Sequence, residues 1–168
     1  MSPRAAWRLE ALGFEDVNDY VAGKADWLAN GLPREGRAAT VPYAGDLVDA
    51  DPPTCRPGDT VARLRERLGG GGDAFLLVLN ERRIVLGRVR RGALLRAEPS
   101  AGAVDVMEPG PSTVRPNVPA RDLVRRLTDR GLGSAIVTTP AGRLVGVFRR
   151  RDAEERLGGI ERSGPPHR

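Results

Sequence analysis

Two stretches of the chain carry the same helical pattern of apolar positions. Val61, Leu64 and Leu68 recur at the spacing of one helix face, and Leu123 and Leu127 do so further along, with arginine and acidic residues between them. Apolar residues three and four positions apart line one side of an α-helix. The sequence therefore predicts two amphipathic helices, each with one side buried.

Each predicted helix is followed by two short, mostly apolar segments, and these four segments are residues 75–79, 84–89, 135–139 and 144–148. Apolar runs of this length without strict alternation are typical of strands buried on both faces, which requires helices packed on the sheet. A second helix is therefore expected after each strand pair, at 92–96 and at 151–157.

The two patterns are copies of one unit, 59 residues apart. The tetrapeptide Thr-Cys-Arg-Pro at 54–57 returns as Thr-Val-Arg-Pro at 113–116, and with the same offset Gly87 falls on Gly146 without a gap. Since a unit of this size buries little surface alone, the copies are expected to pack together with pseudo-two-fold symmetry. The predicted fold is α/β (α+β): two β-α-β-β-α repeats with a small N-terminal helix-strand-helix extension.

The rest of the chain is less regular. A helix at 5–12, a strand at 16–20 and a helix at 23–30 are expected first, with Gly31 in the left-handed conformation that ends many helices. A stretch with proline, small and acidic residues follows and is interpreted as a linker that packs partly on the next domain. The predicted parts are an N-terminal segment, a linker, two repeats and a disordered tail, at residues 1–36, 37–53, 54–104, 105–157 and 158–168.

The second copy closes on Gly-Val-Phe-Arg-Arg-Arg-Asp, at residues 146–152. A leading Thr-Val-x-Pro segment, a helix, a strand pair and a closing Gly-h-h-(Ser/Thr)-x-x-Asp motif, where h is apolar, resemble the CBS (cystathionine-β-synthase-type) domain in order and length. The glycine, both apolar residues and Asp152 match the motif, and Arg149 stands at its hydroxyl position. The resemblance covers residues 54–157 and implies a tandem CBS pair, or Bateman module.

The resemblance also implies a ligand site around the second repeat. In the family, the motif's aspartate accepts hydrogen bonds from ribose hydroxyls, and the Ser/Thr position and the leading threonine help to hold ribose or phosphate. Carried over, Asp152 would hold the ribose and Arg149 would meet a phosphate, although Asp152 also fits a helix N-cap. The other residues of the implied site lie on the leading segment or the next strand: Ser112, Thr113, Val114 and Val137. Implied ligands are AMP, ADP, ATP or S-adenosylmethionine, and no cofactor is required.

The first copy keeps the backbone plan of the motif but not its chemistry. Ala93 stands where the second copy has Asp152, and Arg88 replaces the first apolar residue after Gly87. An alanine side chain cannot accept a hydrogen bond from ribose. At most one nucleotide cleft is therefore expected, around the second repeat.

The N-terminal segment has a resemblance of its own. Residues 12–33 look like the C-terminal end of a rhodanese (sulfurtransferase) domain, which closes on Gly-Phe, a strand, a glycine, Ala-x-Trp and Ala-Gly-Leu-Pro. The matching positions here include Phe14, Gly23 and Trp27. The family's catalytic cysteine loop lies upstream of this segment, so a rhodanese-like remnant without sulfur transfer is expected.

Charge and composition narrow the function classes. The net charge is +5 and Lys24 is the only lysine, so arginine dominates, which indicates either codon bias on a solvated surface or contact with phosphate or nucleic acid. Aromatic residues make up 4% of the chain, which disfavours base stacking and hence nucleic acid. With one cysteine, Cys55, and one histidine, His167, neither a metal cluster nor a catalytic residue is expected. The apolar runs are too short to span a bilayer and the N-terminus lacks a signal-peptide pattern, so a cytoplasmic location without membrane contact is expected.

The leading hypothesis is a non-enzymatic, homodimeric regulatory module that senses an adenine nucleotide or related ligand and responds by a change in repeat packing or partner choice. Two alternatives stay open. One is a scaffold that dimerises without a ligand. The other is nucleic-acid binding through the arginine-rich strand ends, which would weaken steeply with salt.

Overall fold

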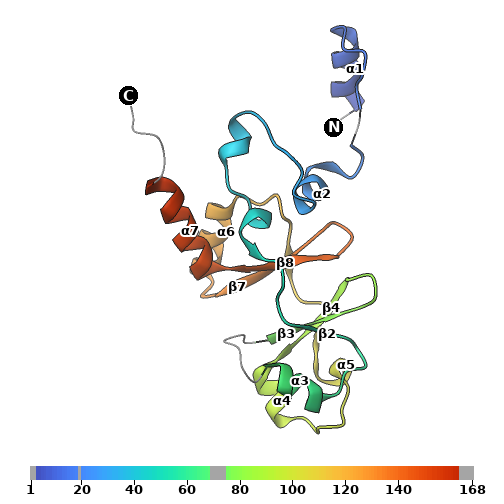
Figure 1. The fold of residues 1–168 in the computed structure, drawn as a ribbon, viewed down its shortest axis with the longest axis vertical. Coiled ribbons are helices and arrows are strands. Elements are labelled where there is room, and N and C mark those ends of the chain that lie inside the picture. The colour runs from blue at the N-terminus through green and yellow to red at the C-terminus, as the bar shows by residue number, and fades with distance from the viewer. Residues whose placement is uncertain (1–2, 19, 69–74, 163–168) are drawn as a thin grey trace.

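The computed structural model describes residues 3–18, 20–68 and 75–162 of the chain. Its central feature is a pair of four-stranded sheets, one above the other in Figure 1, with helices packed against each. The strand orders are β2-β3-β4-β5 and β1-β8-β7-β6. The predicted mixed α/β fold with two repeated units is confirmed.

The first repeat is built on the lower sheet of Figure 1. Its strands are β2 (Thr54–Cys55), β3 (Phe75–Leu79), β4 (Val85–Arg90) and β5 (Glu108–Pro109), and its helices are α3 (Val61–Leu68), α4 (Arg91–Arg96) and α5 (Ala103–Val106). Strand β2 runs parallel to β3, and the other pairs are antiparallel. Val61, Leu64 and Leu68 all point into its core, as the apolar pattern predicts.

The second repeat repeats this plan in the upper sheet. Its strands are β1 (Val48–Asp49), β6 (Thr113–Val114), β7 (Ser134–Thr138) and β8 (Leu144–Arg149), and its helical elements are the 3₁₀ helix η2 (Ala44–Leu47), α6 (Ala120–Asp129) and α7 (Arg150–Arg162). Strand β6 is parallel to β7, and β7 is antiparallel to β8. Phe148 is fully buried in its core with Leu123 and Leu127.

The C-terminal helix is longer than the sequence predicts. Helix α7 continues through Gly158 and Gly159 to Arg162, so the expectation of a disordered tail is wrong for residues 158–162, and residues 163–168 lie outside the described part. The helix is anchored because Ala153 and Leu157 are buried in the core of the second repeat. An anchored helix can continue past glycines that lower its intrinsic propensity.

Each sheet takes one edge strand from the segment that precedes the other repeat. Strand β1 precedes β2 of the first repeat but pairs with β8 of the second, and β5 precedes β6 of the second repeat but pairs with β4 of the first. The exchange is symmetric: the Ala44 amide donates to the Val118 carbonyl at 2.8 Å, and the Ala103 amide donates to the Asp59 carbonyl at 2.8 Å. The donor Ala103 lies 59 residues after the donor Ala44, and the acceptor Val118 lies 59 residues after the acceptor Asp59, so the pseudo-two-fold relation holds at the level of single hydrogen bonds.

The exchanged segment lies inside the stretch that the sequence interprets as a linker, residues 37–53. Ala44 and Leu47 are buried in the core of the second repeat, so this stretch packs on the repeat pair through its second copy. The Asp46 carboxylate accepts the Tyr43 amide at 2.8 Å, as Asp105 accepts the Gly102 amide at 2.9 Å. The 59-residue period therefore begins upstream of Thr54, at about Tyr43.

A third apolar cluster joins the two repeats through their strand pairs. It contains Leu77, Leu79, Ile136, Leu144 and Val147, all nearly or fully buried. Backbone hydrogen bonds link the two hairpin turns, from the Val85 amide to the Gly142 carbonyl and from the Leu144 amide to the Arg83 carbonyl. The two repeats therefore share one continuous interface rather than a simple tether.

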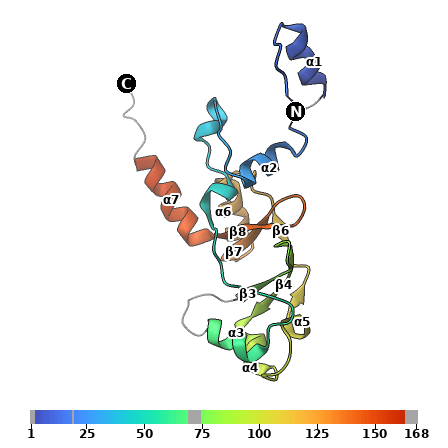
Figure 2. The same ribbon diagram turned by 45° about the vertical axis from the view of Figure 1, so that its right-hand side comes forward.

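The N-terminal part contains α1 (Pro3–Ala11), α2 (Gly23–Ala29) and the 3₁₀ helix η1 (Arg37–Thr40). Both helices agree with the sequence, and Gly31 has the expected left-handed φ of 63°. The strand predicted at 16–20 is wrong, because residues 16–18 and 20 have no strand partner. Helix α1 stands apart from the body in both views (Figures 1 and 2). No helix in the described ranges has the length and apolar character needed to cross a bilayer.

Candidate ligand clefts

The motif glycine of each repeat lies against the exchanged strand. A Cβ at Gly146 would meet the Asp49 carbonyl oxygen and would lie 2.8 Å from Cβ of Val48. A Cβ at Gly87 would lie 2.9 Å from the Glu108 carbonyl oxygen and would also meet the Met107 side chain. The glycine of the motif is therefore explained by close approach of two strands.

The arginine at the hydroxyl position of the motif pairs with an acid on that strand. Arg149 Nη2 lies 3.1 Å from Asp49 Oδ2, and the equivalent Arg90 Nε lies 2.7 Å from Glu108 Oε1. Glu108 also accepts a hydrogen bond from Arg88 at 2.7 Å. The Arg88 hydrogen bond, reinforced by Arg90, holds the pKa of Glu108 below its usual range, against a smaller opposing effect of desolvation.

Asp152 lies in the first turn of α7, directly after β8. Because the helix begins at Arg150, Asp152 is its third residue and not its N-cap. The side chain is exposed, and its carboxylate has no hydrogen-bond or ion-pair partner among the described residues. A carboxylate in this position is favoured by the helix dipole and is available to a ligand. The structure therefore places Asp152 and Arg149 together at the end of β8.

The other predicted site residues lie elsewhere in the same sheet. Thr113 is on β6, which the strand order separates from β8 by all of β7, a spacing of about 10 Å. Its hydroxyl accepts a hydrogen bond from Thr138 at 3.1 Å, and Arg115 donates to Thr138 at 3.2 Å. Ser112 and Val114 flank Thr113 on this edge, and Val137 is fully buried in the core. Val137 is on the strand next to β8 and Thr113 is one strand further, so a shared ligand site with Asp152 stays a prediction.

A cleft of about 930 Å³ lies in the first repeat, where the sequence predicts no site. It is bounded by β2, the turn after it, α3 and the β3–β4 turn. Four of its lining residues are arginines and two are acidic: Arg56, Arg63, Arg67, Arg83, Asp59 and Glu81. Cys55 also lines it, but burial, with the charge of Asp59, raises the pKa of its thiol to about 11, so it is a protonated structural cysteine.

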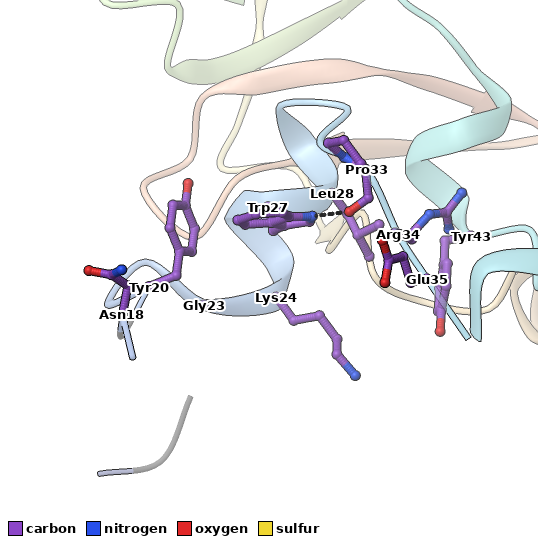
Figure 3. A pocket seen from close by; sticks show the side chains of 10 residues that line it. All are labelled: Asn18, Tyr20, Gly23, Lys24, Trp27, Leu28, Pro33, Arg34, Glu35 and Tyr43. Atoms are coloured by element: carbon purple, nitrogen blue, oxygen red, sulfur yellow. Dashed lines mark hydrogen bonds between the residues drawn. The ribbon is translucent and has the colours of Figure 1, made fainter. Parts of the chain in front are cut away.

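A second cavity, of about 710 Å³, lies between α2 and the segment that leads to η2 (Figure 3). The Trp27 indole N–H donates to the Pro33 carbonyl at 2.8 Å, and the Tyr20 and Trp27 rings meet edge to face at 5.1 Å. The Tyr20 hydroxyl donates to Asp26, and that bond raises the pKa of the phenol. Arg34 lies 5.3 Å from the Tyr43 ring centroid and pairs with Asp46 at 3.1 Å. Aromatic and apolar residues line the cavity together with two cations, Lys24 and Arg34, and one acid, Glu35.

Among the described residues, no three histidine, cysteine or acidic side chains gather in a way that would hold a metal ion.

The second repeat matches a known family. Residues 103–159 match the family model of the CBS domain. No curated protein sequence matches the chain.

Solved structures share the fold of both repeats together. The cytosolic domain of the Mg²⁺ channel MgtE in complex with ATP is 24% identical, with a TM-score of 0.60 over 71% of this chain and 51% of that one. CBSX2 in complex with AMP is 20% identical, with a TM-score of 0.62 over 71% and 98%. The CBS domain pair of MJ0100 in complex with 5′-methylthioadenosine and S-adenosyl-L-methionine is 15% identical, with a TM-score of 0.58 over 71% and 98%.

The chain spans about half the length of the MgtE cytosolic domain and nearly all of the other two. Together with the family match over residues 103–159, this likeness supports the fold of a CBS-domain pair. The rhodanese-like segment has no support from these comparisons.

Proposed function

We propose that the chain is a regulatory CBS pair that binds an adenine nucleotide or a related ligand at the end of β8. The observation that carries the proposal is Asp152, an exposed carboxylate without a partner in the described residues, at the motif position where the first repeat has Ala93. An exposed carboxylate without a partner can accept hydrogen bonds from ribose hydroxyls. The AMP, ATP and S-adenosylmethionine in the similar structures support this ligand class.

The ion pair beside Asp152 gives the site a means of response. Arg149 is held by Asp49 on the exchanged strand β1. A phosphate that binds Arg149 competes with Asp49 for the guanidinium, since both are anionic acceptors of the same N–H donors. Loss of that pair loosens β1 from β8 and so shifts the packing of the repeats. The signal passes from the ligand to the segment before the first repeat, and through a homodimer to its partner.

The test is isothermal titration with AMP, ADP, ATP and S-adenosylmethionine, combined with thermal unfolding. At a hundred times its dissociation constant, a ligand should stabilise the protein by about 2.7 kcal/mol. Asp152→Ala should abolish binding of the ligand that wild type binds. Asp129→Ala, an exposed aspartate at the end of α6, is the matched control and should bind as wild type does.

Two results contradict the proposal: no stabilisation by any of the four ligands at millimolar concentration, or equal loss of binding in both aspartate variants. The variant Ala93→Asp is an independent test of the same idea. It places the motif carboxylate in the first repeat, at the third residue of α4. A second equivalent of ligand in that variant would support the assignment of the aspartate's role.

A ligand-free scaffold is the second candidate. It is favoured by one observation, that Arg149 and Arg90 are both neutralised by acids of the exchanged strands. The same pairing weakens the case for nucleic acid at the strand ends. If sedimentation shows a stable dimer and that dimer binds none of the four ligands, the scaffold is favoured over the sensor.

A further inference from the structure

We infer that the arginine-lined cleft of the first repeat binds the phosphate chain of a small polyphosphorylated molecule. This site is separate from Asp152 and does not rest on the proposed function. Its volume of about 930 Å³ is in the range of small-molecule sites. Four arginines against two acids leave an excess of positive charge around the cavity.

The arginines are arranged around one anchoring carboxylate. Asp59 is only 13% exposed and lies 3.6 Å from both Arg63 and Arg67. One carboxylate cannot satisfy two guanidinium groups, each with five N–H donors. Arg67 is further fixed by a hydrogen bond to the Thr54 carbonyl at 2.9 Å. These contacts hold two cationic groups on α3 beside the cleft before any ligand arrives.

Two further arginines face the cleft from loops. Arg56 follows β2, and Arg83 is in the β3–β4 turn. Neither guanidinium has an ion-pair partner among the described residues. Arg83 has a left-handed φ of 60°, and its counterpart Gly142 in the second repeat has a φ of 79°, so the turn of both repeats adopts this conformation. The first repeat thus carries an arginine where the second has the glycine that suits this φ.

The second repeat lacks this cation set, so the set is not a by-product of the repeated backbone. The positions of Arg63 and Arg83 are occupied there by Asp122 and Gly142. Arg115, the counterpart of Arg56, is turned onto Thr138 and the Thr139 carbonyl. In the second repeat the charge is therefore reversed on the helix and absent from the turn. At the leading segment the arginine is present, but its guanidinium is hydrogen-bonded within the protein. At these three positions the first repeat has arginines that line the cleft, and the second repeat does not present a free guanidinium group there.

The chemistry favours a chain of phosphates over a single anion or an apolar ligand. Guanidinium groups form paired N–H···O bonds with phosphate oxygens, and donors on α3, the leading segment and the turn suit several phosphates at once. Inorganic triphosphate and pyrophosphate are therefore the probes, and ATP tests whether a nucleoside adds affinity. A long single-stranded oligonucleotide serves as the competitor that tests a polymer occupant.

The experiment measures triphosphate binding by calorimetry for the full chain. The variant Arg63→Asp/Arg83→Gly gives the first repeat the residues of the second, and it should bind at least about tenfold more weakly because two charge-assisted contacts are lost. Glycine suits the φ of residue 83, and Arg63 is 64% exposed, so the fold should persist, as circular dichroism will show. Arg83→Gly alone tests the site if the double variant unfolds.

Arg126→Ala is the control, since Arg126 is the exposed counterpart of Arg67 in the second repeat. It should leave triphosphate binding unchanged. The inference is overturned if triphosphate does not bind at millimolar concentration. It is also overturned if Arg126→Ala and the double variant lose the same amount of triphosphate affinity. A third contrary result is an oligonucleotide that binds more tightly than triphosphate and whose affinity does not change when Arg63 and Arg83 are replaced.

Discussion

Replacement of Gly146 by alanine tests the strand exchange directly. The added methyl group would meet the Asp49 carbonyl oxygen and would lie 2.8 Å from both Cβ and Cγ2 of Val48. A carbonyl oxygen and a β-branched side chain cannot swing away, so β1 itself has to move. Overpacking of this kind costs about 1–3 kcal/mol, and we expect Gly146→Ala to lie at the upper end.

The equivalent change in the first repeat gives a graded comparison. A Cβ at Gly87 would meet the sulfur and Cγ of Met107, which is flexible, and the Glu108 carbonyl oxygen at 2.9 Å. The Met107 side chain can adopt another rotamer, so Gly87→Ala should cost less, about 1 kcal/mol. Gly133→Ala is the control, because nothing lies within 4 Å of its added Cβ and its φ is not left-handed.

Urea unfolding followed by circular dichroism gives the three free energies of unfolding by linear extrapolation. In thermal unfolding, each kcal/mol should lower the midpoint by about 2–4 °C for a chain of this size. The reasoning is refuted if Gly146→Ala is as stable as Gly133→Ala, or if Gly87→Ala is the most damaging of the three.

Two further predictions concern buried side chains. Phe148 is 0% exposed, so Phe148→Ala should lower the free energy of unfolding by about 3–5 kcal/mol, whereas Trp7→Ala, at 69% exposure, should change it by less than about 0.5 kcal/mol in the same urea assay. Burial raises the pKa of Cys55 from 9.0 to about 11, so the folded protein keeps a proton that the unfolded chain loses. The stability that Cys55 contributes should therefore be complete below about pH 9 and should fall towards pH 11; parallel stability curves for wild type and Cys55→Ala would contradict this.

The helices and strand pairs of the repeats could be predicted from the sequence because each carries its own local signal. Strand β3 has the bounds that its apolar run indicates, and the helices place Leu64 and Leu123 in the two cores. The segment 16–20 has a composition that favours a strand, but its described residues have no neighbouring strand to pair with. A strand is stable only when a neighbour takes its backbone hydrogen bonds, and composition does not supply one.

The strand exchange and the layout of the site could not be predicted in the same way. Element η2 has four residues and β1 has two, too few to show a period. Which repeat they join depends on long-range hydrogen bonds such as that between Ala44 and Val118. Thr113 is in the leading segment of the second repeat and Asp152 is in its closing motif, and the sequence does not show that β7 lies between their strands β6 and β8. The sequence does contain a signal for the arginine cleft, because Arg63 of the first repeat is replaced by Asp122 at the equivalent position of the second. A charge that differs between two copies of one backbone is not required by that backbone.

The strand exchange also determines how the two proposed sites relate. The pair of Arg149 and Asp49 lies at the proposed nucleotide site, and only the residues 50–53 separate Asp49 from Thr54 at the start of the arginine cleft. This connection is stiff, because Pro52 is buried and the Pro53 carbonyl accepts the Leu77 amide at 3.0 Å. A ligand that displaces Asp49 therefore moves the entry of β2, and phosphate bound beside β2 resists that movement. Because binding free energies are reciprocal, each ligand would weaken the other by the same factor.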